Sequence, residues 1–231
     1  MSNHQNVIDL FKSLTHEFEL FMEGVGGLFL KHPKISGEPF PIVHSIRKRI
    51  KNEGHLRDKL ERKAAKGNVV NSDNCFDQIT DFAGVRVLHL RQEDFEKIKD
   101  VVDEKISKHD WHLFEPPIAY TWDPEYEQYF LKLGCRCERK DSFYTSVHFV
   151  VKPRPDSPLS CEIQVRTLFE EIWGEIDHQL NYPHPTTVPS CTEQLRVLAK
   201  VVGAGSRLVT SIFNSSEAAV RAESASRLKI D

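Results

Sequence analysis

The chain has 231 residues, of which 39% are hydrophobic and 28% charged, as is typical of one globular domain with added helices. A net charge of −3 and a sequence pI near 6.4 exclude a strong overall attraction to nucleic acid. No apolar run reaches the roughly 18 residues needed to cross a membrane, and the N-terminus lacks the features of a signal peptide. We therefore predict a cytoplasmic protein with no membrane contact.

The N-terminal segment is predicted to form a helix over residues 5–23, because its apolar side chains recur about every 3.6 residues. The glycines that follow are expected to disturb its end: Gly24, Gly26 and Gly27. Residues 31–41 contain three prolines and a glycine, which predicts a loop.

A densely basic second helix is predicted from about residue 42 to residue 66. The polar segment 67–74 that follows is predicted to be a loop. Asp77 is a candidate cap for a short helical turn after this loop.

The middle of the chain begins with a predicted buried strand over 83–90. Residues 92–107 return to helical spacing. The pattern over 109–140 is weaker and indicates a strand followed by an irregular segment.

Residues 143–152 and 159–166 are predicted to be two strands of a hairpin, joined by the turn PRPDSP. Helices are predicted at about 167–181 and 190–214, and the tail beyond 215 could extend the last helix. Trp173 and Ile176, at helical spacing, are expected in the core.

The order of helices, strand, helix, strands and helices predicts an α+β fold in which helices flank a mixed sheet. We expect three parts: an N-terminal helix and loop over 1–40, a central domain over 41–185 and a helical extension over 186–231.

Two acidic residues lie at or within predicted strands. Asp81 directly precedes the strand 83–90, and Glu162 lies inside an otherwise apolar strand. A carboxylate in such a strand is costly unless it is paired or binds a metal. If the strands are neighbours, the two carboxylates could hold one Mg²⁺ ion together with phosphate oxygens. The alternative is that each pairs with a nearby arginine, Arg86 or Arg166.

Basic side chains could bind a polyphosphate near these carboxylates. On a helical wheel Arg49, Lys59 and Arg62 fall within roughly 80° of one another. The alternative is a solvated surface with interspersed acidic residues.

In the predicted hairpin, Tyr144, Ser146 and His148 alternate onto one face, which could present an aromatic ring and an imidazole to a nucleotide. The alternative is a half-buried strand with a hydrogen-bonded histidine. The five cysteines are odd in number and include no CxxC pair, which favours scattered reduced thiols over structural zinc.

Four segments, taken together and in this order, resemble the synthetase domain of RelA/SpoT homologues, especially the small single-domain alarmone synthetases. They cover more than half of the chain. They are RIKNEGHLRDKLERK at 49–63, DFAGVRVL at 81–88, KDSFYTSVH at 140–148 and EIQVRTLFEEIWGEIDHQLNY at 162–182.

The resemblance implies the nucleotidyltransferase-like fold of that family over the central domain and a Mg²⁺-dependent transfer of pyrophosphate. A 3′-oxygen of the acceptor would attack the β-phosphorus of ATP, and AMP would leave. Asp81 would bind the metal, and Glu162 would either help the metal or activate the acceptor 3′-hydroxyl. The implied ATP-binding residues are Arg49, Lys51, Lys59, Arg62 and Arg86. The implied acceptor-binding residues are Lys140, Tyr144, Ser146, His148, Gln164, Arg166 and Glu171.

The chain departs from the family pattern around the acceptor. Phe143 stands where the family has glycine, Thr145 where it has arginine, and Asp177 where glutamate usually precedes His178. Glu171 replaces an asparagine near the guanine, although its carboxylate could still accept hydrogen bonds from guanine N1 and N2.

We therefore expect ATP as donor and GTP or GDP as acceptor, giving pppGpp or ppGpp. One alternative is a toxin-type relative that modifies adenine nucleotides or the 3′ end of tRNA. A second alternative is an inactive module that binds nucleotides or RNA. The hydrolase signature of bifunctional relatives is not visible, so no hydrolase activity is expected. The amphipathic terminal helices could form a homo-oligomer or pack on their own domain.

Overall fold

The computed structural model describes residues 3–37, 39–182 and 184–227. Within them, seven strands form one sheet in the order β1-β2-β7-β6-β4-β5, and β3 also pairs with β6. The pairs β2/β7 and β4/β5 are parallel and the others are antiparallel, so the predicted mixed sheet is confirmed. The strands are β1 Val43–Ile50, β2 Ala83–His89, β3 His112–Leu113, β4 Ile118–Tyr120, β5 Arg136–Glu138, β6 Ser146–Lys152 and β7 Cys161–Thr167.

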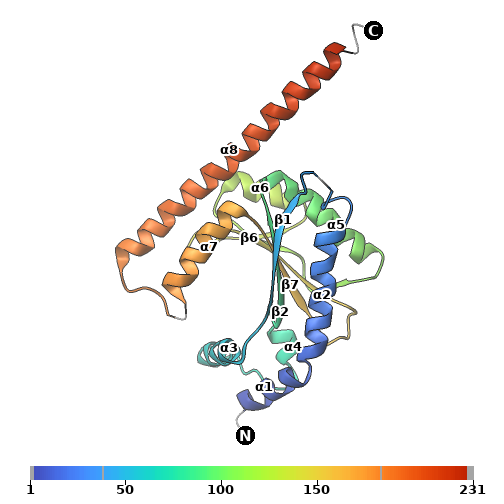
Figure 1. The fold of residues 1–231 in the computed structure, drawn as a ribbon. Helices are drawn as coiled ribbons and strands as arrows, with labels where there is room; N and C mark the ends of the chain where they lie inside the picture. Colours follow the sequence, from blue (N-terminus) through green and yellow to red (C-terminus); the bar gives the residue numbers. More distant parts are fainter. Residues whose placement is uncertain (1–2, 38, 183, 228–231) are drawn as a thin grey trace.

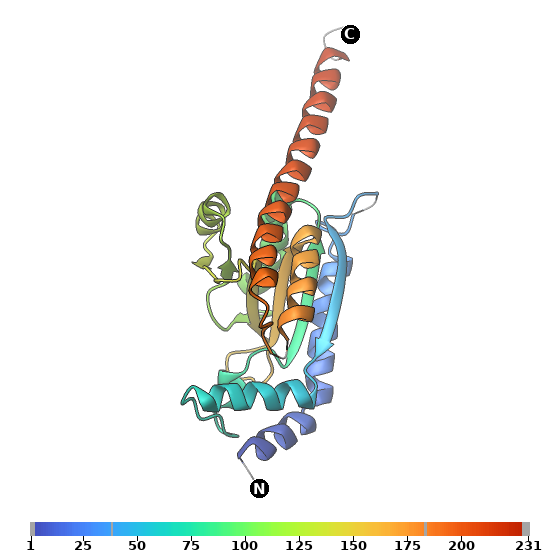
Figure 2. The ribbon, with the colours of Figure 1, turned by 90° about the vertical axis from the view of Figure 1, so that its left-hand side faces the viewer.

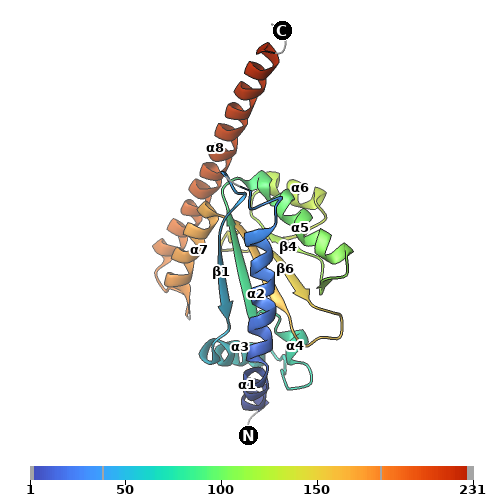
Figure 3. The same cartoon turned by 45° about the vertical axis from the view of Figure 1, so that its right-hand side comes forward.

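Helices cover both faces of the sheet, which gives the predicted α+β architecture (Figure 1). Helices α2 and α5 lie on one face, and α7 lies on the other with α8 outside it (Figures 1 and 2). Helices α1 and α3 lie at one end of the sheet (Figure 3). The helices are α1 Asn3–Ser13, α2 Thr15–Lys31, α3 Glu53–Ala65, α4 Cys75–Gln78, α5 Phe95–Ser107, α6 Pro124–Lys132, α7 Leu168–Asn181 and α8 Pro189–Arg227, with a 3₁₀ turn, η1, at Gln92–Asp94.

The main core lies between the sheet and the helices α1, α2 and α5. Phe18 and Phe82 are fully buried there, and the ring of Phe11 stacks on Phe82 at 4.7 Å. A smaller cluster joins α7 to α8 around Trp173, whose indole N–H donates to the carbonyl of Leu195. Burial of Trp173 confirms part of the core prediction, whereas Ile176 is 39% exposed and does not belong to the core.

The predicted basic helix over 42–66 is wrong in its first half. Residues Val43–Ile50 form β1, which pairs antiparallel with β2, so Arg49 belongs to a strand and shares no helix face with Lys59. The helix α3 begins only at Glu53, after Asn52, whose side chain accepts a hydrogen bond from the amide of His55 at 2.8 Å.

The predicted helix over 5–23 is in fact two helices. Helix α1 ends at Ser13, and α2 runs from Thr15 through the three glycines to Lys31. One of these glycines is required for packing, because a Cβ at Gly26 would lie only 3.0 Å from the side chain of Lys48 on β1. Gly26 therefore allows α2 to approach the sheet closely, and the helix continues past all three glycines.

Most other elements follow the prediction. The strand at 83–90, the helix at 92–107, the hairpin of β6 and β7, and the two C-terminal helices are confirmed, with α8 extending through the tail. Helix α6 was not predicted, although Asp123 caps it and Pro124 opens it. Asp77 lies inside α4 and does not cap it. All five cysteines carry free thiols, and no described helix is both long and apolar enough to span a membrane.

The start of α7 is fixed by a reciprocal pair of hydrogen bonds. The hydroxyl of Thr167 accepts from the amide of Glu170, and the Glu170 carboxylate accepts from the amide of Thr167 at 2.7 Å. Glu170 is only 7% exposed, and this burial raises the pKa of its carboxyl from 4.5 to about 7.

We expect this carboxyl to make stability depend on pH. Because folding favours the protonated form, Glu170 stabilises the fold below pH 4.5 and loses that contribution as pH rises through about 7. The loss amounts to about 3–4 kcal/mol, because the shift spans about 2.5 pKa units at about 1.4 kcal/mol each. Urea unfolding between pH 4.5 and 8 should show Glu170→Gln with a flatter profile than wild type, whereas the exposed control Glu19→Gln should follow wild type. An unchanged profile in Glu170→Gln would contradict the assignment.

Candidate functional site

A pocket of about 620 Å³ lies on the α7 side of the sheet, where β2 and β7 run parallel. Side chains alternate along these strands, so Val85 and Ile163 enter the main core while Arg86, Glu162 and Gln164 face the pocket. The register places Glu162 beside Gly84 and Gln164 beside Arg86. Strand β1 and the last two turns of α7 form the remaining walls.

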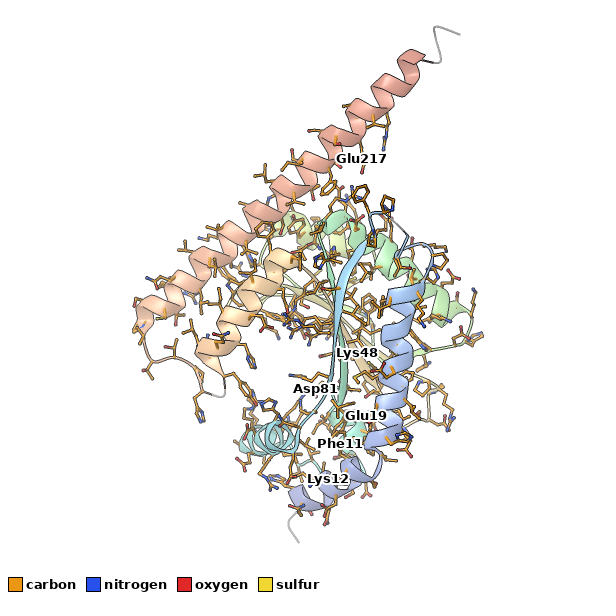
Figure 4. All side chains as sticks on the ribbon, viewed as in Figure 1. Phe11, Lys12, Glu19, Lys48, Asp81 and Glu217 are labelled. Carbon is orange, nitrogen blue, oxygen red and sulfur yellow. The ribbon has the colours of Figure 1, made fainter. Side chains whose placement is uncertain are left out.

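Asp81 lies at the end of the sheet near α3, just before β2 (Figure 4). Its two carboxylate oxygens accept hydrogen bonds from the ammonium groups of Lys51 and Lys59, both at 2.7 Å. Burial alone would raise the pKa of the Asp81 carboxyl, but the charges and hydrogen bonds of Lys59 and Lys51 hold it well below its ordinary value. Asp81 is therefore an ionised carboxylate held between two cations at the pocket.

Glu162 faces the same pocket and has different partners. Its Oε1 accepts from Nδ1 of His148 at 3.1 Å, and its Oε2 accepts from the Gln164 amide at 2.6 Å. Burial alone would raise the pKa of Glu162, but the His148 charge and hydrogen bond outweigh it and lower the pKa. Glu162 is therefore also ionised, and its charge is close enough to that of Asp81 for the two to interact.

A chain of hydrogen bonds leads from Glu162 to a buried arginine. Nδ1 of His148 carries a proton because the carboxylate can only accept. Nε2 of His148 lies 3.0 Å from the Tyr144 hydroxyl, which also accepts from Arg166. Arg166 is 4% exposed, and its guanidinium lies over the Tyr144 ring at 4.9 Å. The geometry thus fixes Tyr144 and His148 together behind Glu162.

Glu171 of α7 is bound by three arginines. Its carboxylate lies 2.7 Å from Arg86, 3.3 Å from Arg47 and 3.3 Å from Arg166. The side chain is 7% exposed and does not line the pocket. Contact between Glu171 and a guanine base stays a prediction, and it would require the release of at least one of these arginines.

Most of the sequence-predicted residues come together here. Those that line the pocket are Arg49, Asp81, Arg86, Tyr144, Glu162, Gln164 and Arg166. Those that touch these residues from outside the lining are Lys51, Lys59, Ser146, His148 and Glu171.

Two predicted residues lie apart from this group. Arg62 is exposed on α3 and bonds the backbone oxygen of Asp58. Lys140 is exposed and lies 4.4 Å from the centre of the Tyr120 ring. The alternative pairing of Asp81 and Glu162 with Arg86 or Arg166 is not seen, because both arginines bind Glu171 instead.

The pocket also has walls that the sequence motifs did not assign. The rings of His178 and Tyr182 stack at 4.8 Å on the last turn of α7, and His55 of α3 meets Tyr182 edge-on. Arg47 and Glu175, which both line the pocket, form an ion pair. The spacing of four between residues 178 and 182 was a usable signal, because such pairs are neighbours on a helix.

The segment before Tyr144 has a strained backbone. Phe143 adopts a φ of 67°, in the left-handed region that glycine tolerates and bulky residues avoid. Its ring stacks on Trp122 at 5.2 Å, and the guanidinium of Arg139 lies 5.3 Å from its centre. Such a conformation costs about 1–3 kcal/mol and persists only where packing holds it.

The two carboxylates suit a magnesium ion. Mg²⁺ commonly takes one or two carboxylates and completes its shell with water and substrate phosphates. Asp81 and Glu162 are both ionised and both open to the pocket. Among the described residues no three His, Cys, Asp or Glu side chains are grouped as ligands, so the rest of the shell of a metal held here would come from water or substrate oxygens.

A family model described as a region found in RelA/SpoT proteins matches residues 48–187, which is more than half of the chain. This range contains α7 and all seven strands, apart from the first residues of β1. It therefore includes every residue that lines the pocket except Arg47. No curated protein sequence matches the chain.

Several solved structures share the fold. The small alarmone synthetase 1 from Bacillus subtilis aligns over 90% of this chain and 94% of its own, with a TM-score of 0.62 and 18% identity. The same protein bound to its product pppGpp covers 89% and 93%, with a TM-score of 0.61 and 18% identity. A GTP pyrophosphokinase family protein from Streptococcus pneumoniae covers 92% and 93%, with a TM-score of 0.62 and 20% identity.

Proposed function

Because this chain belongs to the RelA/SpoT family, we propose that it transfers the β,γ-pyrophosphate of ATP to the 3′-hydroxyl of GTP or GDP. The observation that carries the proposal is the meeting of Asp81 and Glu162 in one pocket, across two neighbouring parallel strands. Phosphoryl-transfer sites combine carboxylates for a metal, cations for the phosphates and a group that orients the nucleophile. The pocket offers all three.

The donor side is formed by β1, α3 and the segment that leads into β2. Lys51 and Lys59 neutralise Asp81 in this structure. When a triphosphate enters, their ammonium groups can turn to its oxygens, as cations do in phosphoryl-transfer sites. Arg49 and Arg86 line the same side and would contact the rest of ATP. Arg62 would have to move toward the pocket to take part.

The acceptor side is formed by β6, β7 and Tyr144. Glu162 would take the proton of the 3′-hydroxyl as its oxygen attacks the β-phosphorus. The bond from that phosphorus to the α,β-bridging oxygen breaks, and AMP leaves. His148 holds Glu162 in position, and Tyr144 would present its ring to the purine. Lys140, which lies 3.7 Å from Glu138 and over the Tyr120 ring, would turn toward the acceptor phosphates.

Asp81 and Glu162 would hold Mg²⁺, which when bound neutralises charge on the transferred phosphates. The three basic neighbours of Glu171 and the two of Asp81 would steer the nucleotides' anionic groups toward these carboxylates. The cytoplasmic location predicted from sequence stays part of this proposal, and the choice between a homo-oligomer and terminal helices packed on their own domain stays open.

Phe143 gives a specific reason to consider a second acceptor. Next to Tyr144, where the family has glycine, the left-handed backbone carries the ring of Phe143, which stacks on Trp122. An adenine nucleotide or a tRNA 3′ end would use the same donor side and the same two carboxylates.

A transfer assay with γ-labelled ATP and Mg²⁺ tests the proposal. GTP, GDP, ATP and bulk tRNA are offered as separate acceptors, and Glu162→Gln serves as the control. Label on GTP or GDP, lost in the variant, is the expected result. Label on tRNA or adenine nucleotides would mean that the same transfer reaction uses a different acceptor. Nucleotide binding without any transfer would favour an inactive binding module.

Gly174 is expected to affect binding of the acceptor, because the space above it is occupied by the side chain of Arg166. A Cβ at position 174 would lie 2.6 Å from a guanidinium nitrogen of Arg166, so alanine must displace that side chain. Arg166 holds Tyr144, and we therefore expect Gly174→Ala to raise the KM for GTP about tenfold or more, at about 1.4 kcal/mol for each factor of ten, with a smaller change in the KM for ATP.

Gly27→Ala is the matched control, since nothing lies within 4 Å of a Cβ at that helical position. It should leave both KM values unchanged and gain up to about 1 kcal/mol of stability. Equal KM values for GTP in wild type and Gly174→Ala would show that Arg166 does not position the acceptor.

A further inference from the structure

A second pocket, of about 660 Å³, lies between η1, α6 and the outer half of α8. None of its lining residues belongs to the site described above. Its volume is within the range of about 300–1,000 Å³ that small-molecule sites occupy.

Two arginines hold α8 against the body on either side of this pocket. Arg207 of α8 forms an ion pair with the buried Asp123 and lies 5.4 Å from the centre of the Tyr126 ring. Arg91 bonds Glu217 of α8 at 2.6 Å and lies 4.9 Å from the centre of the Phe213 ring. The walls are therefore fixed by contacts at both ends.

Two oxygens in the wall are buried without a hydrogen-bond partner among the described residues: Oε1 of Gln92 and Oγ1 of Thr210. The Gln92 side chain belongs to a residue that is only 3% exposed. An unpaired buried acceptor costs free energy, and folded proteins keep few of them. Two such oxygens on lining residues of one pocket point to a ligand that supplies N–H or O–H donors once these side chains turn toward it.

The charges in the pocket disfavour anions. Glu93 and Glu125 line it with exposed carboxylates, and the one cation in its described lining, Arg207, is already paired with Asp123 and lies 4.0 Å from Glu125. A phosphate group would meet net negative charge here. Tyr126 and Tyr129 give the pocket aromatic surface, which suits a planar ring.

We propose that this pocket binds an uncharged nucleobase or nucleoside, whose ring lies against the tyrosines and whose N–H groups donate to Gln92 and Thr210. The ligand would bridge η1 and α8, two elements that contact each other in this structure. This site is separate from the proposed transfer site.

Isothermal titration of the full chain with adenosine and with guanosine tests the proposal, in the presence of a saturating non-hydrolysable ATP analogue that occupies the donor side. At least one nucleoside should bind, and the corresponding monophosphate should bind about tenfold more weakly or worse. Gln92→Leu and Thr210→Val should each weaken nucleoside binding about tenfold. Ser216→Ala, an exposed change on α8 outside the pocket, should bind like wild type.

The stability of the free protein gives a second readout. Because leucine removes an unpaired acceptor from a buried position, Gln92→Leu should keep or raise the melting temperature while it loses the ligand. Absence of nucleoside binding in wild type would overturn the proposal. Equal affinity in wild type, Gln92→Leu and Thr210→Val would overturn it as well, because the ligand would then bind elsewhere.

Discussion

Replacing Glu162 by glutamine should reduce pyrophosphate transfer by on the order of 10²- to 10⁴-fold, the usual contribution of a general base. Glutamine keeps the size of the side chain and one acceptor oxygen, so the hydrogen bond from His148 can persist. It cannot take up the proton of the 3′-hydroxyl. We expect the free energy of unfolding to fall by only about 1 kcal/mol, the usual net value of one hydrogen bond.

Initial rates at saturating ATP and acceptor, with a melting curve for each variant, measure the two effects separately. Glu175→Gln is the matched control, because Glu175 is another carboxylate in the wall of the same pocket and is 44% exposed. It should change the rate by only a few fold. If Glu162→Gln retained more than a tenth of the wild-type rate, Glu162 would not be the base.

Replacing Asp81 by asparagine should cost both turnover and stability. The amide removes the charge that a metal needs, and a thousandfold loss of rate would correspond to about 4 kcal/mol of lost transition-state stabilisation. It also leaves Lys51, which is 6% exposed, without its ionic partner. Removal of one member of a buried ion pair typically costs about 3–5 kcal/mol. Asp81→Asn should therefore melt well below wild type.

A second change separates these two losses. In Asp81→Asn combined with Lys51→Met, the unpaired buried ammonium group is gone, and most of the melting temperature should return. Activity should not return, because the carboxylate is still missing. Turnover by the double variant near the wild-type rate would contradict the assignment of Asp81 as a metal ligand. An unchanged melting temperature in Asp81→Asn would contradict a stabilising ion pair between Asp81 and Lys51.

Much of the sheet was readable from sequence, since β2 and β7 have clear apolar faces. Strand β1 could not be predicted, because basic residues that make contacts on both of its faces interrupt the alternation of apolar and polar residues. Ile46 and Ile50 pack toward α2, but Lys48 stands between them on the same face and pairs with Glu23 of α2. The opposite face carries Arg47 and Arg49, which serve the pocket. A strand with basic residues on both faces resembles a charged helix until its partner strand is known.

The sequence predicted which residues form the candidate site better than it predicted the contacts between them. Sequence placed Asp81 and Glu162 in one site, which depended only on their strands being neighbours. The hydrogen-bond and ion-pair partners of each carboxylate depend also on which side chains from other strands and helices extend to it, and the sequence does not give this. Glu171 thus binds three arginines, contacts that the sequence did not predict. Lys59 meets Asp81 from α3 rather than from a helix shared with Arg49.

Phe143 shows how a local rule and the tertiary structure can disagree. Local preference favours glycine at a φ of 67°. The ring of Phe143 is nevertheless kept there by Trp122, which lies in the loop between β4 and α6, and by packing against α8. No pattern within residues 139–145 could have revealed this support.

The residues proposed for the donor and those proposed for the acceptor come from two separate stretches of the chain. Every residue proposed for the donor lies within 49–86, and every residue proposed for the acceptor lies within 140–171. The two stretches meet along the backbone ladder of β2 and β7, whose hydrogen bonds do not depend on side-chain identity. A chimera that exchanges only residues 140–171 would therefore inherit a new acceptor while it kept its phosphate donor.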